Sequence, residues 1–178
     1  LDQNNIATSS IVIISVNFDV ERKKAKINFK NLKGIVKDIA LRIKPGCLII
    51  VESTLPPGTT KKIIYPEIVK IFKKRKIQLD KIRLAYSFER VTPGSNYLNS
   101  IKLMHRVYAG INKQSELKVK RFLKSIIDLN NAKLCKLSNI TEVETCKIIE
   151  NTYGFEIFLE NLVQYKIQNK KDKPIITF

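Results

Sequence analysis

Two groups of polar residues stand where a folded chain could use them for chemistry. Ser53-Thr54 and Ser87-Phe88-Glu89 each follow an apolar run directly, and Lys147 and Asn151 lie four residues apart in a helical pattern. Residues at that spacing project from one side of a helix. A lysine there can stabilise a developing negative charge and an amide can orient a ligand, while a partly desolvated carboxylate can act as a base.

Each of these groups also has a plainer structural role. The hydroxyls of Ser53-Thr54 can bind a sugar or a phosphate, and they can equally cap the helix that follows. Lys147 and Asn151 can belong to a solvated helix edge, and Glu89 can form a local ion pair with Arg90. Position alone leaves the hydroxyls evenly balanced between ligand binding and capping.

The elements that must position these residues alternate along the chain. Apolar runs predict strands over residues 11–16, 47–54, 82–89, 106–111 and 132–138. Helical spacing predicts helices over residues 28–43, from Thr59 or Thr60 to about 74, over 115–127, and from 141 to about 166. Apolar strands that alternate with helices indicate a parallel sheet covered on both faces. Ligands bind beyond the carboxyl ends of the strands in such folds, where both polar clusters lie.

The last predicted helix is the longest element. Thr141 and Glu144 have the spacing of a capping box, and the apolar pattern continues to about Lys166. Its apolar stripe is too long for the predicted sheet to cover, so we expect the helix to self-associate into a homodimer. The stripe consists of Ile148, Thr152, Phe155, Leu159 and Leu162.

The formal net charge of +17 reflects 33 lysines and arginines against 16 acidic residues. It can attract a polyanion or a phosphorylated ligand, or it can belong to solvated lysine-rich helix faces. Nucleic-acid modules interleave basic residues with exposed aromatic residues or glycines. The aromatic residues here lie mostly inside apolar patterns, so we expect no nucleic-acid partner.

The chain has no run near the roughly 18–20 apolar residues that a membrane span needs, and its beginning lacks the layout of a signal peptide. Cys47, Cys135 and Cys146 are widely spaced and form no CxxC pair. Reduced thiols in a cytoplasmic protein are the simplest interpretation. We therefore expect neither a membrane partner nor a metal site.

Three motifs taken together resemble one known family. "VESTLPPGTT", "YSFERVTPG…YLNSI…HRVYAG" and "TEVETCKIIENTY" occur in the order and spacing of the UDP-glucose/GDP-mannose (nucleotide-sugar) dehydrogenases. The "ERV-PG" form is more similar to bacterial members that act on UDP-N-acetylhexosamines. The resemblance covers about Ile11 to Leu159.

The resemblance implies an enzyme that oxidises the sugar CH2OH of a UDP-sugar to a carboxylate with NAD, through a thiohemiacetal on a cysteine. It also implies a fold class: α/β, the C-terminal half of a Rossmann-type parallel sheet followed by a long α-helix. Residues 1–138 would be a partial NAD-binding domain, residues 139–166 the start of a central dimerisation domain, and residues 167–178 a tail.

The same resemblance implies roles for individual residues. Thr54 resembles the threonine near the nicotinamide and the catalytic water, and Glu89 resembles the general base in thioester hydrolysis. Lys147 and Asn151 resemble the pair that holds the oxyanion and the hexose. The residues expected along the sugar nucleotide are Arg90 and Val91, and those expected at the cofactor are Val16, Ser53 and Thr54.

The sequence also departs from the family pattern. It contains no GxGxxG turn for the NAD pyrophosphate and no segment like GGxCxxKD around a nucleophile, and Asn17-Phe18-Asp19 is atypical. Cys146 adjoins Lys147, but a helix-packing thiol is the better interpretation. We therefore expect a partial chain that is inactive by itself. The alternatives are a non-catalytic basic binding or assembly protein and a degenerate, truncated gene product.

Overall fold

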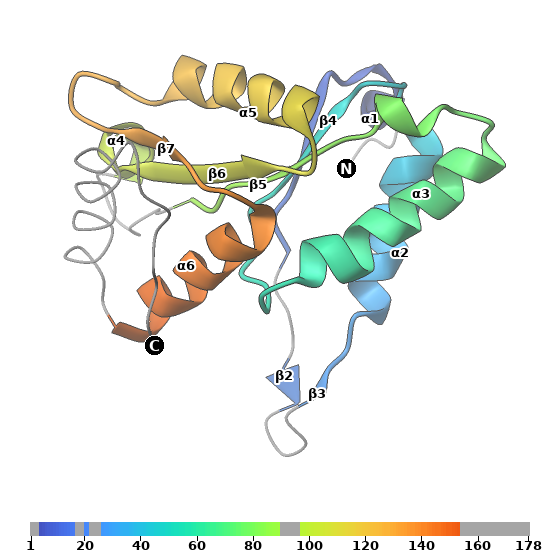
Figure 1. Ribbon diagram of the computed structural model, residues 1–178, viewed down its shortest axis with the longest axis horizontal. Coiled ribbons are helices and arrows are strands. Elements are labelled where there is room, and N and C mark those ends of the chain that lie inside the picture. Colours follow the sequence, from blue (N-terminus) through green and yellow to red (C-terminus); the bar gives the residue numbers. More distant parts are fainter. Residues whose placement is uncertain (1–3, 17–19, 22–25, 90–96, 154–178) are drawn as a thin grey trace.

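A five-stranded sheet forms the centre of the molecule (Figure 1). The computed structural model describes residues 4–16, 20–21, 26–89 and 97–153. Its strands lie in the order β1-β4-β5-β6-β7. They span β1 Ile11–Ile14, β4 Leu48–Val51, β5 Arg83–Tyr86, β6 Arg106–Gly110 and β7 Leu134–Lys136. The predicted α/β class and the five predicted strands are confirmed, with ends that are shorter by one to several residues.

Two strands, β6 and β7, run opposite to β1, β4 and β5, so the predicted parallel sheet contains one antiparallel pair. β1, β4 and β5 pair in parallel, and β6 pairs in parallel with β7. The pair between β5 and β6 is antiparallel, with Tyr86 opposite Ala109. Arg106, the first residue of β6, donates a hydrogen bond of 2.8 Å to the carbonyl of Phe88. β6 therefore begins beside the end of β5, and the connection does not cross the sheet as a parallel pair would require.

Helices cover both faces of the sheet (Figure 1). α2 Lys30–Arg42, α3 Tyr65–Lys74 and α6 Ile140–Tyr153 pack on one face. α5 Lys113–Ile126 packs on the other. The smaller elements are α1 Asn4–Thr8, a ribbon of β2 Val20–Glu21 and β3 Lys26–Ile27, the π-helical turn η1 Thr60–Ile64, the 3-10 turn η2 Leu79–Lys81, and α4 Tyr97–Leu103.

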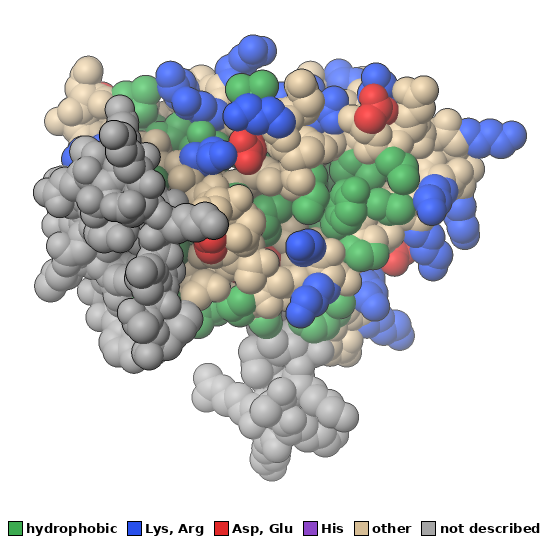
Figure 2. Space-filling view, viewed as in Figure 1, with side chains coloured by type: hydrophobic (Ala, Val, Ile, Leu, Met, Phe, Trp, Pro, Cys, Tyr) green, Lys and Arg blue, Asp and Glu red, His purple; other side chains and the backbone are tan. Residues whose placement is uncertain are grey.

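Basic side chains are spread widely over the surface. Figure 2 shows lysines and arginines over most of the described part of one face, with acidic side chains among them. They do not gather in one patch in this view. This face therefore offers a polyanion no single concentrated site. No helix within the described ranges is both long enough and apolar enough to cross a bilayer.

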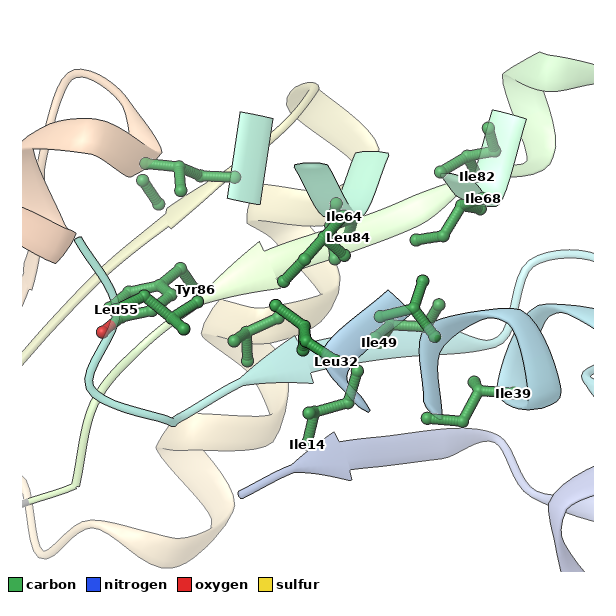
Figure 3. Packing of buried hydrophobic residues seen from close by; sticks show 14 of the residues in the cluster. Ile14, Leu32, Ile39, Ile49, Leu55, Ile64, Ile68, Ile82, Leu84 and Tyr86 are labelled. Atoms are coloured by element: carbon green, nitrogen blue, oxygen red, sulfur yellow. The ribbon is translucent and has the colours of Figure 1, made fainter. Parts of the chain in front are cut away.

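The larger hydrophobic core lies between the sheet and the helices α2, α3 and α6 (Figure 3). β4 contributes to both faces, because successive side chains of a strand point in opposite directions. Ile49 and Val51 enter this core, while Leu48 and Ile50 enter the core under α5. All four residues of β4 are buried, as the uninterrupted apolar run predicts.

Two predicted helices begin within one residue of the expected position, but their predicted side-chain caps are wrong. Thr59, the N-cap residue, already has helical backbone angles, and its hydroxyl donates to the carbonyl of Pro56 at 2.7 Å, so its side chain does not cap the helix. Thr60 is the first residue of η1 and not its N-cap. Asn139 and Glu142 form the capping box of α6. The backbone N–H of Glu142 donates to Asn139 Oδ1 at 3.1 Å, and the Glu142 carboxylate accepts from Asn139 Nδ2 at 2.9 Å. Glu144, the residue predicted for this role, is fully buried elsewhere.

The far end of the predicted long helix lies outside the described residues. α6 is described to Tyr153, so the extension to Lys166 and most of the predicted stripe stay predictions. Within α6, the residues that enter the core are Ile140, Val143 and Cys146. Ile148, the first residue of the stripe, is 36% exposed and lies away from that core.

Candidate functional site

Ser53 closes the edge of the sheet at which β1, β4 and β5 end. It is buried, and its Oγ accepts a hydrogen bond of 2.7 Å from the backbone N–H of Val16. Its carbonyl accepts a bond of 2.8 Å from the hydroxyl of Tyr86. Burial raises the pKa of Tyr86, and the Glu144 carboxylate adds to the rise, so Tyr86 is a neutral donor. Ser53 and Val16 thus hold the edge together, and their contact with a cofactor stays a prediction.

Thr54 lies on the outside of this edge and meets the last described helix. Thr54 is exposed, whereas its neighbours Ser53 and Leu55 are buried. Asn151 Nδ2 lies 3.4 Å from Thr54 Oγ1, although 97 positions separate the two residues in the chain. A hydroxyl and an amide side by side offer both donors and acceptors to a hydroxylated ligand.

Lys147 occupies the space between α6 and the loop after β5. Its Nζ donates a hydrogen bond of 3.1 Å to the carbonyl of Glu89 and lies 5.0 Å from the centroid of the Phe88 ring. Glu150 Oε2 is 3.4 Å away, and the side chains of Lys147 and Glu150 are only 13% and 10% exposed. The carbonyl, the carboxylate and the ring face together fix the position of the ammonium group.

The four residues predicted to be catalytic therefore lie together. Thr54 follows β4, Glu89 follows β5, and Lys147 and Asn151 project from α6. Side-chain contacts of 3.1 Å and 3.4 Å join Lys147 to the carbonyl of Glu89 and Asn151 to Thr54. Their catalytic roles stay predictions. Arg90-Val91 and Asn17-Phe18-Asp19 lie outside the described residues.

Sequence reasoning missed a buried ion pair next to Glu89. Arg106 Nη1 lies 3.4 Å from Glu52 Oε1, and the two side chains are 3% and 12% exposed. Burial raises the pKa of Glu52; the charge of Arg106 opposes this rise and that of Glu89 adds to it. The available signal was an arginine at the start of the apolar run "RVYAG", since a charge is rarely buried there unless it is paired.

The chain matches proteins of one family in sequence. The model of the "UDP-glucose/GDP-mannose dehydrogenase family, NAD binding domain" matches residues 2–129. A UDP-N-acetyl-D-mannosamine dehydrogenase from Methanococcus aeolicus is 34% identical over 143 residues, which are 80% of this chain and 30% of the relative. The Escherichia coli protein of the same name is 27% identical over 128 residues, which are 68% of this chain and 29% of the relative. The chain thus spans about a third or less of these relatives.

The fold matches solved structures as well. The structure of a UDP-D-ManNAc dehydrogenase from Pyrococcus horikoshii superposes with a TM-score of 0.73 at 22% identity. The superposition covers 85% of this chain and 34% of that one. At this level of identity the likeness supports the fold, and the sequence matches carry the relationship.

Proposed function

The chain belongs to the UDP-glucose/GDP-mannose dehydrogenase family, and we propose that it forms part of an NAD-dependent nucleotide-sugar 6-dehydrogenase. The proposed reaction oxidises the CH2OH group of a UDP-N-acetylhexosamine to a carboxylate for polysaccharide precursors. The two relatives described above support this class of sugar through their names, UDP-N-acetyl-D-mannosamine dehydrogenase.

One observation carries the proposal. Three segments that are distant in the sequence bring an exposed hydroxyl, an amide, an ammonium group and the Glu89 loop together at the carboxyl edge of the sheet. Open α/β sheets bind their ligands at this edge. A polar set of this kind can orient a sugar and stabilise charge on its oxygen.

Lys147 and Asn151 are proposed to act on the sugar directly. The ammonium of Lys147 already donates to a carbonyl oxygen at 3.1 Å, so an oxygen of the substrate that carries negative charge is a stronger acceptor at the same position. Asn151 lies one helical turn further on the same side of α6 and donates toward Thr54. Its amide can therefore align a hexose hydroxyl while Lys147 stabilises the developing oxyanion.

Glu89 and Thr54 are proposed to handle water and protons. Glu89 is half-buried, and its neighbour Phe88 is fully buried, so its carboxylate lies at the boundary between the core and the solvent. A carboxylate there can accept a proton from the water that hydrolyses an acyl intermediate. Thr54 can orient that water through its exposed hydroxyl.

The described residues fit the reactive end of NAD. Val16 and Ser53 tie the ends of β1 and β4 together, and Thr54 presents its hydroxyl beside them at the edge where dinucleotides bind in this fold. The chemistry that NAD supplies when bound is acceptance of a hydride from the sugar carbon, and oxidation of CH2OH to a carboxylate needs this twice, with a fresh NAD for each hydride. No glycine-rich phosphate turn occurs within these 178 residues, so we expect the isolated chain to show no turnover.

A chimaera tests the proposal. Residues 4–153 replace the corresponding segment of the Methanococcus aeolicus relative, and NADH formation from UDP-N-acetyl-D-mannosamine is followed by absorbance. We expect NAD reduction, and we expect Lys147→Ala to lower kcat by about 100- to 1000-fold, the usual effect of losing one oxyanion donor.

Lys37→Ala, at an exposed position of α2, is the matched control and should leave kcat unchanged. A folded chimaera that reduces no NAD with any UDP-sugar contradicts the proposed function. Equal activity of the Lys147→Ala and Lys37→Ala variants contradicts the role of Lys147.

A further inference from the structure

Glu144 is a fully buried carboxylate that the proposed chemistry does not use. It lies in α6 three residues before Lys147, and its relative exposure is 0%. Its two oxygens accept hydrogen bonds from backbone N–H groups, Oε2 from Gly58 at 2.5 Å and Oε1 from Thr60 at 2.8 Å. Among the described residues, no lysine or arginine forms a salt bridge with it. Burial raises the pKa of the Glu144 carboxyl, and the hydrogen bonds from Thr60 and Gly58 oppose this rise.

The turn that receives Glu144 is shaped for this contact. Gly58 has a φ of +88°, a conformation that other residues rarely adopt. The N–H of Thr59 bonds the carbonyl of Pro56 at 3.1 Å, which closes the turn and leaves the N–H groups of Gly58 and Thr60 directed at one point. The start of η1 has no side-chain cap from its own N-cap residue, Thr59. Glu144 supplies that cap from another element.

The contact joins the two segments that carry the halves of the candidate site. Thr54 lies four residues before Gly58, in the segment that Glu144 holds. On the other side, Lys147 and Asn151 follow Glu144 at helical spacing in α6. The bond from Asn151 to Thr54 spans the same gap nearer the surface.

We propose that Glu144 is a positioning residue for the candidate site. This proposal rests on the proposed function. Its carboxylate binds α6 to the 56–60 turn and thereby keeps Lys147 and Asn151 within reach of Glu89 and Thr54. The carboxylate suits this task because both oxygens are acceptors. A glutamine would offer one acceptor and turn its NH2 group toward a second N–H donor.

The test uses NMR of the 178-residue chain and needs no enzymatic activity. We expect Glu144→Gln to accelerate hydrogen exchange of the Gly58 or Thr60 amide by about 10- to 100-fold, the factor for losing one hydrogen bond to a charged group. We also expect loss of the nuclear Overhauser effect between the side-chain amide of Asn151 and Thr54. Glu142→Gln is the matched control, since it removes the same charge from the same helix and should leave the contact between Asn151 and Thr54 intact.

Glu144→Asp keeps the carboxylate on a side chain that is one methylene shorter. If the Gln variant does not fold, the same two NMR measurements are made on the Asp variant. A folded variant that loses the contact between Asn151 and Thr54 supports the proposal. Folded variants that keep this contact overturn it. Unfolding of both variants also overturns it, because Glu144 is then a requirement of the fold and not a positioning residue. All these outcomes are independent of NAD reduction by the chimaera, so the two proposals can fail separately.

Discussion

Replacing Arg106 by methionine tests whether the ion pair beneath Glu89 is coupled as the structure indicates. The substitution keeps an unbranched apolar side chain and removes the guanidinium group from Glu52 and from the carbonyl of Phe88. Breaking a buried ion pair by removing one partner costs about 3–5 kcal/mol. Because Glu52 retains 12% exposure and the pair is 3.4 Å long, we expect the lower end of that range.

Urea denaturation followed by circular dichroism measures the effect. A loss of about 3 kcal/mol lowers the midpoint by about 1–2 M if the urea dependence is about 2 kcal/mol per M. The double variant Arg106→Met/Glu52→Gln removes the unpaired charge as well. We therefore expect it to be more stable than Arg106→Met. The coupling between the two residues is the change in the double variant minus the sum of the changes in Arg106→Met and Glu52→Gln.

The pH dependence gives a second measure of the same coupling. Burial raises the pKa of Glu52, so the folded state binds this proton more tightly than the unfolded chain does. The corresponding stability is present at low pH and is lost as the pH rises through the folded pKa. Without Arg106 the pKa of Glu52 rises further, so Arg106→Met should cost less stability at about pH 5 than at about pH 7.

Two results would refute this reasoning. The first is a double variant whose stability equals the sum of the two single changes within about 0.5 kcal/mol, because the residues would then be uncoupled. The second is a cost of Arg106→Met that does not vary with pH. Either result would mean that Glu52 is solvated in the folded state.

Two further predictions concern the 56–60 turn and the surface of α6. Gly58→Ala should lower the free energy of unfolding by about 1–3 kcal/mol, because alanine is strained at a φ of +88°; thermal denaturation against Gly34→Ala, which has open space around it, checks this. Ile148→Lys should shift a homodimer toward monomer in sedimentation velocity, because Ile148 is 36% exposed on the predicted dimer stripe. Leu98→Lys, at an exposed position of α4, is the control, and a wild-type chain that stays monomeric at high concentration would contradict the prediction.

The positions of the strands could be predicted because buried strands consist mainly of apolar residues. Leu48–Val51 is apolar and buried at every position, as expected for a strand covered on both faces. Ile11–Ile14 is equally apolar, but Ile13 is 45% exposed, so an apolar run predicts the strand better than its burial. The direction of β6 could not be predicted in the same way. Its residues are equally compatible with both directions, and the difference depends on where Arg106 meets Phe88 in space.

Local patterns also left the start of α6 ambiguous. Asn139 with Glu142 and Thr141 with Glu144 have the same spacing, and each pair can form a capping box. Packing decides between them, because Val143 enters the core and the fully buried Glu144 faces the 56–60 turn. No local sequence pattern shows which of the two pairs caps the helix, because the outcome depends on tertiary packing.

The residues of the candidate site could be predicted from the sequence, but the contacts between them could not. Lys147 and Asn151 share a face of α6, as their spacing indicates. Their spacing predicts no partners, and the structure shows that Lys147 bonds the backbone carbonyl of Glu89 and Asn151 lies against the Thr54 hydroxyl. Contacts across 58 or 97 positions depend on packing that motif spacing does not record.

The π-helical turn η1, which precedes α3, makes the candidate site sensitive to a one-residue deletion in this segment. In η1 the N–H of Tyr65 bonds the carbonyl of Thr60, five residues earlier, whereas an α-helix bonds across four. Shortening the segment by one residue would make the winding regular while Ile68 and Phe72 stayed anchored in the core. The residues upstream would then be rotated by about 100° around the helix axis. The N–H groups that now meet Glu144 would face another direction, so the length of this segment constrains the site.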